Sequence, residues 1–233
     1  FDVGSAGLEG DVRELNVPGG PVRVTVSAGA GQGRRLALVT VPAAGTSSVT
    51  CFQGLFLCMS GSERLSQRFD AYHLELLAPT GAADGTALER VAARVEAAIA
   101  QLGLREVVGL GVGVGGLALA LVAARARVEV AGLILVGPPS KPAGWWEWGF
   151  GRMCYGTLRT KGMTAWCKDH MIQRLFSPGA RDSRDLVASY RREFGELDPR
   201  AAAELLEAAV TRRDELARAL AGAGATHLVV HAR

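Results

Sequence analysis

The chain has 233 residues, of which 48% are hydrophobic, and its formal net charge is +3. This length suits one large α/β domain or two small ones, with enough apolar residues for a sizeable core. The small basic excess falls in separate Arg pairs, which argues against the clustered cationic surface of a nucleic-acid-binding protein. No apolar run has transmembrane length, and no signal peptide is visible at the start. We therefore expect a cytoplasmic protein with no transmembrane segment and no nucleic-acid partner.

The first part of the chain predicts three strands and a helix before a further strand. Alternating apolar residues over 21–27 indicate a strand, with residues 10–17 as its hairpin partner across a Pro-Gly-Gly turn. A continuous apolar run over 36–41 is typical of a buried parallel strand. We then predict a helix over 51–59 and a strand over 69–77.

The most clearly marked helix begins after Thr86. Thr86 and Glu89 form a Thr-x-x-Glu capping box, and Gly103 supplies the stop signal. A strand over 106–110, a glycine-rich turn, an Ala/Leu-rich helix over 117–126 and a buried strand over 130–136 follow. This alternation predicts an α/β fold with a mostly parallel central sheet and helices on both faces.

After Pro139 the sequence predicts helices without strands. Asp198 and Pro199 provide an N-cap and a first-turn proline for one of them. A strand pattern returns over 226–230. Helices inserted between two strands describe a cap, so we expect three regions. These are an α/β core over 1–139, a helical cap over 140–224 and a returning core strand over 225–233, with the remainder of the core beyond residue 233.

A run of glycines joins the strand that ends near residue 110 to the helix that follows it. In α/β-hydrolases this context carries Gly-x-Ser-x-Gly, with the nucleophile at the tip of a strained turn. Here the three positions are Gly111, Gly113 and Gly115. Because Gly113 has no side chain that could attack a carbonyl, we predict a degenerate elbow and no catalytic residue.

The sequence of this turn fits two other interpretations less well. The spacing Gly111-x-Gly113-x-x-Gly116 also fits a dinucleotide fingerprint, but that motif needs an acidic residue at the end of the next strand. That strand ends in Gly-Pro-Pro, so we expect no cofactor. A hydrolase with a displaced nucleophile would need an acid and a His after later strands. Among the histidines, only His231 follows the last strand. Ser140 and Cys154 fit a loop or packing role better than that of a nucleophile.

The four cysteines do not form a metal-binding pattern. They are Cys51, Cys58, Cys154 and Cys167. His170 follows Cys167 by three residues, but no second pair completes a tetrahedral zinc set. We therefore expect no metal site and free thiols in a reducing compartment.

Several motifs, in order along nearly the whole chain, resemble the N-myc downstream-regulated (NDR) family. They include the glycine-rich elbow over 107–116, the strand over 130–139 and the cap start Gly144-Trp145-Trp146-Glu147-Trp148, where the family has K-G-W-x-D-W. Shorter matches lie at 174–177, 186–191 and 211–216. Pro42 and Ala43 depart from the pattern, because the family has a His-Asp pair there.

The resemblance implies an α/β-hydrolase fold without hydrolase activity. It also implies action through protein partners as a binding or scaffold module in signalling, stress response or trafficking. Tryptophan is enriched at binding hot spots, so Trp145, Trp146, Trp148 and Trp166 form the candidate partner surface. Two alternatives stay open: a structural subunit of a large cytoskeletal or ciliary assembly, and an active hydrolase with non-standard residues.

Overall fold

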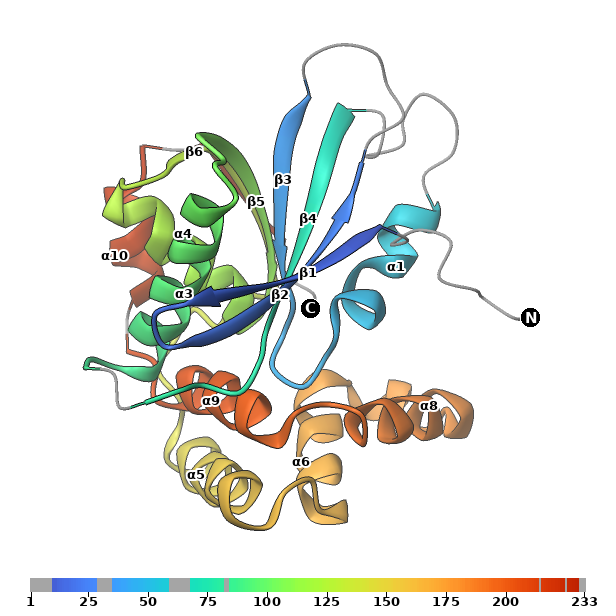
Figure 1. The fold of residues 1–233 in the computed structure, drawn as a ribbon. Coiled ribbons are helices and arrows are strands. Elements are labelled where there is room, and N and C mark those ends of the chain that lie inside the picture. Colours follow the sequence, from blue (N-terminus) through green and yellow to red (C-terminus); the bar gives the residue numbers. More distant parts are fainter. Residues whose placement is uncertain are drawn as a thin grey trace.

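A computed structural model describes residues 10–28, 35–58, 68–81, 84–213, 215–224 and 226–230. The described strands form one sheet in the order β1-β2-β4-β3-β5-β6-β7 (Figure 1). They are β1 (Asp11–Val17), β2 (Gly20–Ser27), β3 (Leu36–Val41), β4 (Phe69–Leu76), β5 (Glu106–Val112), β6 (Glu129–Val136) and β7 (Thr226–Val230).

The sheet is antiparallel at one edge and parallel elsewhere. β1 and β2 form the predicted hairpin, with Val17 paired to Gly20 across the turn. Gly19 and Gly20 have φ of 92° and 130° there, values that residues with a side chain rarely adopt. β2 pairs antiparallel with β4, and the remaining strands are parallel to their neighbours. The predicted mostly parallel α/β sheet is confirmed.

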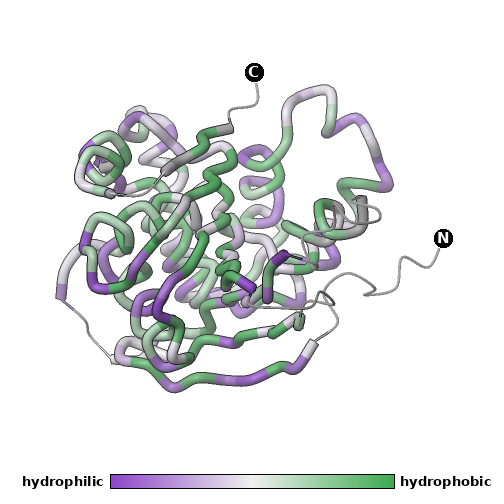
Figure 2. The backbone as a smooth tube through the Cα atoms, turned by 90° about the horizontal axis from the view of Figure 1, so that it is seen from above, coloured by the Kyte–Doolittle hydropathy of each residue, from purple (hydrophilic) through white to green (hydrophobic). Residues whose placement is uncertain are grey.

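Helices cover both faces of the sheet. One face carries α3 (Ala87–Gln101), α4 (Val114–Arg125) and α10 (Glu215–Gly222), and the other carries α1 (Ser48–Cys58) (Figure 1). Alternate strand residues point to opposite faces. Val39 and Leu135 therefore join the main hydrophobic cluster beneath α3 and α4, whereas Leu38 packs with residues of α1. Figure 2 shows the hydrophobic stretches gathered in the interior of the molecule.

The start of α3 has the predicted capping box. The Thr86 hydroxyl accepts a hydrogen bond from the Glu89 amide at 3.2 Å, and the Glu89 carboxylate accepts one from the Thr86 amide at 2.7 Å. Each group satisfies a backbone donor that the first helical turn leaves free. The local sequence signal therefore corresponds to the observed helix start.

Most of the helical region between β6 and β7 lies beyond the carboxyl ends of the parallel strands (Figure 1). The helices placed there are α5 (Trp145–Lys161), α6 (Ala165–Leu175), α7 (Pro178–Arg181), α8 (Arg184–Phe194) and α9 (Pro199–Val210). Asp198 caps α9 as the sequence predicts, because its carboxylate accepts from the amides of Arg200 and Ala201 at 2.8 and 3.0 Å. We refer to α5–α9 as the cap.

α9 and α10 connect the cap with the core. α9 packs Leu206 and Val210 against the α5 side of the cap, while Leu205 belongs to the main core cluster. α10 packs on α4 through Leu216 and Ala219. The last helix before β7 therefore lies on the core, and the expected cap boundary at residue 224 stays a prediction. Among the described helices, none has the length and apolar character that crossing a membrane requires.

Candidate functional site

The turn between β5 and α4 holds Gly113 in a conformation that favours glycine. Its φ is 57° and its ψ is −122°. Its amide donates to the carbonyl of Val136 on the neighbouring strand at 2.9 Å, which fixes the turn against β6. A strand, a sharp turn at positive φ and a helix are the context in which α/β-hydrolases place their nucleophile. Here that position has no side chain.

The flanking glycines are required by close packing. A Cβ on Gly111 would lie 2.5 Å from the backbone of Gly116, and one on Gly115 would lie 2.3 Å from the Val41 carbonyl oxygen. At Gly113 the nearest atom to a Cβ is the methyl of Ala43 at 3.6 Å, an ordinary contact. Sterics therefore demand glycine at positions 111 and 115, whereas at position 113 the constraint comes from φ alone.

Cap and core meet close to Ala43 through a polar contact. The Ser47 hydroxyl donates to the Glu193 carboxylate of α8 at 2.8 Å. Burial raises the pKa of Glu193, although the hydrogen bonds from Ser47 oppose the shift. Burial also raises the pKa of the Cys51 thiol, against hydrogen bonds from Ala43 and Thr46. A thiol in this protonated state is a poor nucleophile.

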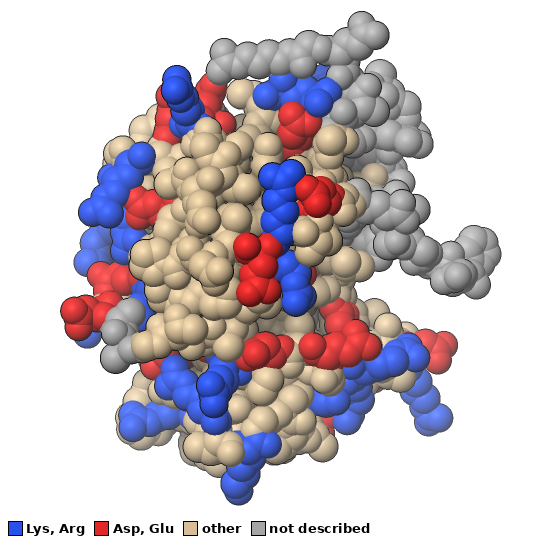
Figure 3. Space-filling model, viewed as in Figure 1, with Lys and Arg blue, Asp and Glu red and all other residues tan. Residues whose placement is uncertain are grey.

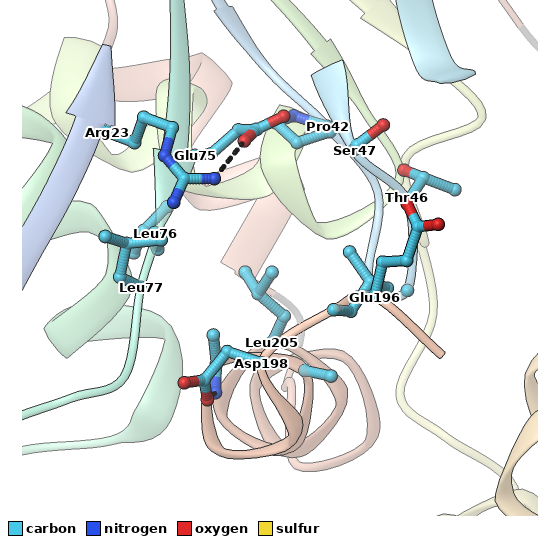
Figure 4. Close-up of a pocket in the computed structure, with 14 residues that line it drawn as sticks. Arg23, Pro42, Thr46, Ser47, Glu75, Leu76, Leu77, Glu196, Asp198 and Leu205 are labelled. Carbon is cyan, nitrogen blue, oxygen red and sulfur yellow. Dashed lines mark hydrogen bonds and ion pairs between the residues drawn. The ribbon is translucent and has the colours of Figure 1, made fainter. Parts of the chain in front are cut away.

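A small pocket lies next to this contact, between the loop after β3, the ends of β2 and β4, and the start of α9 (Figure 4). Its volume is about 80 Å³. Arg23 lies 3.7 Å from Glu75, and Glu75 also accepts from the Ser48 amide at 2.6 Å. Asp198 is already occupied as the α9 cap. The pocket is therefore small, with these polar groups already bound to protein partners, and Gly113 does not line it.

The buried histidine of the sheet has a structural environment. His73 of β4 is hydrogen-bonded to Thr40 of β3 at 2.8 Å and lies against the rings of Phe52 and Phe56. Burial lowers the pKa of His73 to about 4, so the ring is neutral at pH 7. The sequence gives no sign of this residue's environment, because the strands that bury it are joined only in the folded sheet.

The remaining candidate residues are dispersed. Ser140 is exposed in the loop after β6, and His231 lies outside the described residues. Cys51, Cys154 and Cys167 are free thiols, with the last two buried, and the side chain of Cys58 lies outside the described part. Within the described ranges, no group of three or more His, Cys, Asp or Glu side chains could hold a metal ion.

The cap exposes the predicted tryptophan surface. Trp145 and Trp146 are 77% and 75% exposed, Trp166 is 39% exposed, and Trp148 is half-buried. Trp145 stacks on Trp148 with ring centroids 5.7 Å apart. Trp146 and Trp166 line one groove of about 530 Å³ between α5 and α6. The structure thus brings residues 146 and 166 together, and none of the four tryptophans is fully buried.

Two further aromatic residues belong to this groove and were not singled out from the sequence. Phe150 stacks on Trp146 at 6.3 Å, and His170 stacks on Trp166 at 5.9 Å. Both pairs are four residues apart on a helix, the spacing at which side chains meet. That spacing is the signal that could have identified them.

The family model described as Ndr matches residues 12–232. The chain belongs to the Ndr family. Protein NDL3 of Arabidopsis thaliana is 33% identical over 201 residues, which cover 80% of this chain and 57% of NDL3. Protein NDRG2 of Danio rerio is 27% identical over 179 residues, covering 72% of this chain and 45% of NDRG2. This Ndr-family chain therefore spans about half the length of these relatives.

Solved structures similar to this Ndr-family chain are hydrolases. An enol-lactonase from Burkholderia xenovorans matches with a TM-score of 0.72 and 19% identity, over 93% of this chain and 80% of that chain. A hydrolase from Pseudomonas aeruginosa matches with a TM-score of 0.70 and 13% identity, over 95% and 91%. The TM-scores establish the shared α/β-hydrolase fold. At identities this low, the fold does not establish an activity, which has to be argued from the residues of the site.

Proposed function

We propose that this Ndr-family chain is a non-catalytic α/β-hydrolase-fold protein that binds other proteins, as a scaffold in cytoplasmic signalling, stress response or trafficking. The observation that carries the proposal is Gly113. The turn retains the shape that presents a nucleophile in hydrolases, and it presents none here.

The surroundings of Gly113 support the same proposal. Ala43 is the neighbour of the turn, and a methyl group supplies neither an acid nor a base. His73 is hydrogen-bonded to Thr40 and enclosed by aromatic rings, an environment that suits packing. The Cys51 thiol is held protonated by burial. Neither His73 nor Cys51 is thus an activated replacement for the missing serine.

The exposed tryptophans supply the second half of the proposal. Side chains as large as Trp145 and Trp146 bury much apolar area when a partner covers them, and such residues dominate binding energy at interfaces. The groove between α5 and α6 adds a concave surface lined by Trp146, Phe150 and Trp166. We assign protein binding to this surface.

Activity is tested first, on the purified protein. A fluorophosphonate probe and a panel of esters and lactones should give no labelling and no turnover, with an active α/β-hydrolase as the positive control. Labelling or turnover that the folded protein shows and the heat-denatured protein does not show would contradict the proposal. It would indicate an active hydrolase with non-standard residues.

Partner binding is tested separately. Proteins captured from an extract by the wild-type chain should be lost with Phe150→Ala/Trp166→Ala, which alters the groove, and kept with Val12→Ala. Val12 is 60% exposed on β1, at the sheet edge, and serves as the matched apolar control. Equal capture by all three proteins would rule out this groove. A constant large native complex would instead indicate a structural subunit of a cytoskeletal or ciliary assembly.

A further inference from the structure

The outer face of α5 is an exposed aromatic surface that the packing of the protein does not use. α5 buries Gly151, Cys154 and Leu158 on the side that faces α9. Large apolar side chains lie outside that buried side, and they are Trp145 at 77% exposure, Trp146 at 75%, Met153 at 60% and Phe150 at 48%. Soluble monomers rarely expose contiguous apolar patches of this kind unless the patch binds something.

The stretch that contains α5 and α6, residues 141–181, is strongly basic. Residues 141–181 contain seven Lys and Arg against two Asp and Glu, a net charge of +5 where the whole chain has +3. Figure 3 shows Lys and Arg along the lower rim, where the cap lies, with acidic side chains above them near its junction with the core. The positive charge is therefore concentrated in residues 141–181, which include α5 and α6, and the later part of the cap carries most of its acidic residues.

Both acidic residues of this segment are already paired. Glu147 accepts from Arg174 and Arg212 at 3.0 Å each, and Asp169 pairs with Arg191. In contrast, the exposed cations Lys141 and Arg152 form no ion pair with any carboxylate that the structure describes. Arg152 lies over the ring of Trp148 at 5.3 Å, so cationic and aromatic groups share one face.

Aromatic side chains beside unpaired cations are typical of a helix that lies in a membrane interface. Trp and Phe enter the level of the headgroups, while Lys and Arg pair with anionic lipids and bury their aliphatic stems. α5 lies at the lower edge of the molecule in Figure 1, where a flat surface can reach it. The most exposed side chains, Trp145 and Trp146, are adjacent at the start of the helix.

We propose that the outer face of α5, formed by Trp145, Trp146, Phe150, Met153 and Arg152, docks on an anionic lipid bilayer together with the exposed Lys141 of the loop that precedes the helix. The aromatic residues enter the interface and the two cations pair with lipid headgroups. This inference goes beyond the protein-binding proposal and does not rest on it. The two proposals use Trp146 and Phe150 in common, because these residues also line the groove between α5 and α6, so the bilayer and a protein partner would compete for them.

The tryptophans themselves report on the docking. All four tryptophans of the chain lie in the cap at positions 145, 146, 148 and 166. Vesicles of phosphatidylcholine with phosphatidylserine should shift the intrinsic fluorescence to shorter wavelength, and brominated lipid should quench it. Vesicles of phosphatidylcholine alone should do neither. Added salt should weaken the binding, because it screens the attraction between Arg or Lys and the lipid.

Matched variants separate the two contributions in vesicle co-sedimentation. Lys141→Gln/Arg152→Gln should reduce the partition coefficient by about fivefold per cation, and Trp145→Ala/Trp146→Ala by on the order of tenfold or more. Arg105→Gln changes an exposed cation at the start of β5, beyond the opposite end of the sheet, and should bind like the wild type. Val12→Ala is the apolar control. Unchanged circular dichroism and thermal midpoints establish that the variants fold.

Three results would overturn this proposal. They are no binding to the phosphatidylserine vesicles, equal binding to both vesicle types, and equal losses in the variants and their controls. Binding of an acidic peptide through Trp145 and Trp146, with no binding to vesicles, would assign the face to a protein partner instead. Neither that result nor the vesicle result affects the hydrolase assay, so failure of this inference is distinguishable from failure of the proposed function.

Discussion

Arg94 of α3 and Glu204 of α9 form a buried ion pair that joins the core to the cap, with Nη1 and Oε2 2.5 Å apart. Their side chains are 1% and 3% exposed. Arg94 also donates to the carbonyls of Pro21 and Leu77 at 2.7 and 2.9 Å, so one guanidinium contacts the cap, the hairpin and the end of β4. Burial nevertheless lowers the pKa of Arg94, which indicates how much this charge depends on Glu204.

Glu204→Gln should therefore destabilise the protein by roughly 3–5 kcal/mol, because it leaves the buried Arg94 charge without its counter-charge. The free energy of unfolding from urea titration measures the effect. Glu207→Gln is the matched control on the same helix. Glu207 is 20% exposed and pairs with Arg90 and the more exposed Arg159. Water can reach this carboxylate, so its loss should cost only about 1 kcal/mol. A similar loss in both variants would contradict the assigned role of the buried pair.

The elbow glycines should tolerate alanine unequally. Gly115→Ala places a Cβ 2.3 Å from the Val41 carbonyl oxygen, so β3 and α4 must move apart. Gly113→Ala meets no close atom and costs only the strain of its positive φ, about 1–3 kcal/mol. Chemical denaturation should rank Gly115→Ala as clearly the more destabilising change. The opposite order would contradict the close approach of Gly115 to the Val41 carbonyl.

Gly113→Ser should fold and should not create an esterase. The serine would occupy the nucleophile position, but a working triad also needs a histidine base oriented by an acid. Of the histidines whose side chains the structure describes, His73 is hydrogen-bonded to Thr40 and His170 stacks on Trp166. Turnover of p-nitrophenyl esters measures the outcome, with Gly113→Ala as the control for background hydrolysis. A rate above that background would show that the remaining catalytic groups are present.

Stability should decrease below neutral pH because of His73. Burial lowers its pKa from 6.5 to about 4 in the folded protein. Between these values the unfolded chain binds a proton that the folded protein does not, so stability falls as the pH falls, by up to about 3 kcal/mol in total. Unfolding free energies across pH 4 to 7 measure the slope. His73→Gln keeps a partner for Thr40 and should flatten it.

Glu193 acts in the opposite direction in that experiment. Its pKa is raised in the folded protein, so its contribution is present at low pH and is lost as the pH rises through the folded value. The difference between wild type and His73→Gln cancels the Glu193 contribution, because both proteins contain it. A histidine NMR titration gives an independent check, in which the His73 ring signals should stay those of the neutral form down to about pH 5. Protonation near 6.5 would contradict the buried environment.

The sequence by itself determined the features that depend on near neighbours. The Thr86–Glu89 capping box, the Asp198 cap and the β1–β2 hairpin each arise within a few residues, so their signals are local and the structure confirms them. The absence of a side chain at position 113 is likewise visible in the sequence, as is the order of strands and helices that predicts the sheet.

Tertiary structure alone decided which side chains meet and which stay in solvent. Arg94 and Glu204 are 110 residues apart, and Thr40 and His73 come from strands joined only by the sheet. Helical spacing predicted that the tryptophans lie on helices, but their exposure depends on which side of α5 packs against α9. Burial is a property of two surfaces in contact, and a one-dimensional pattern contains only one of them.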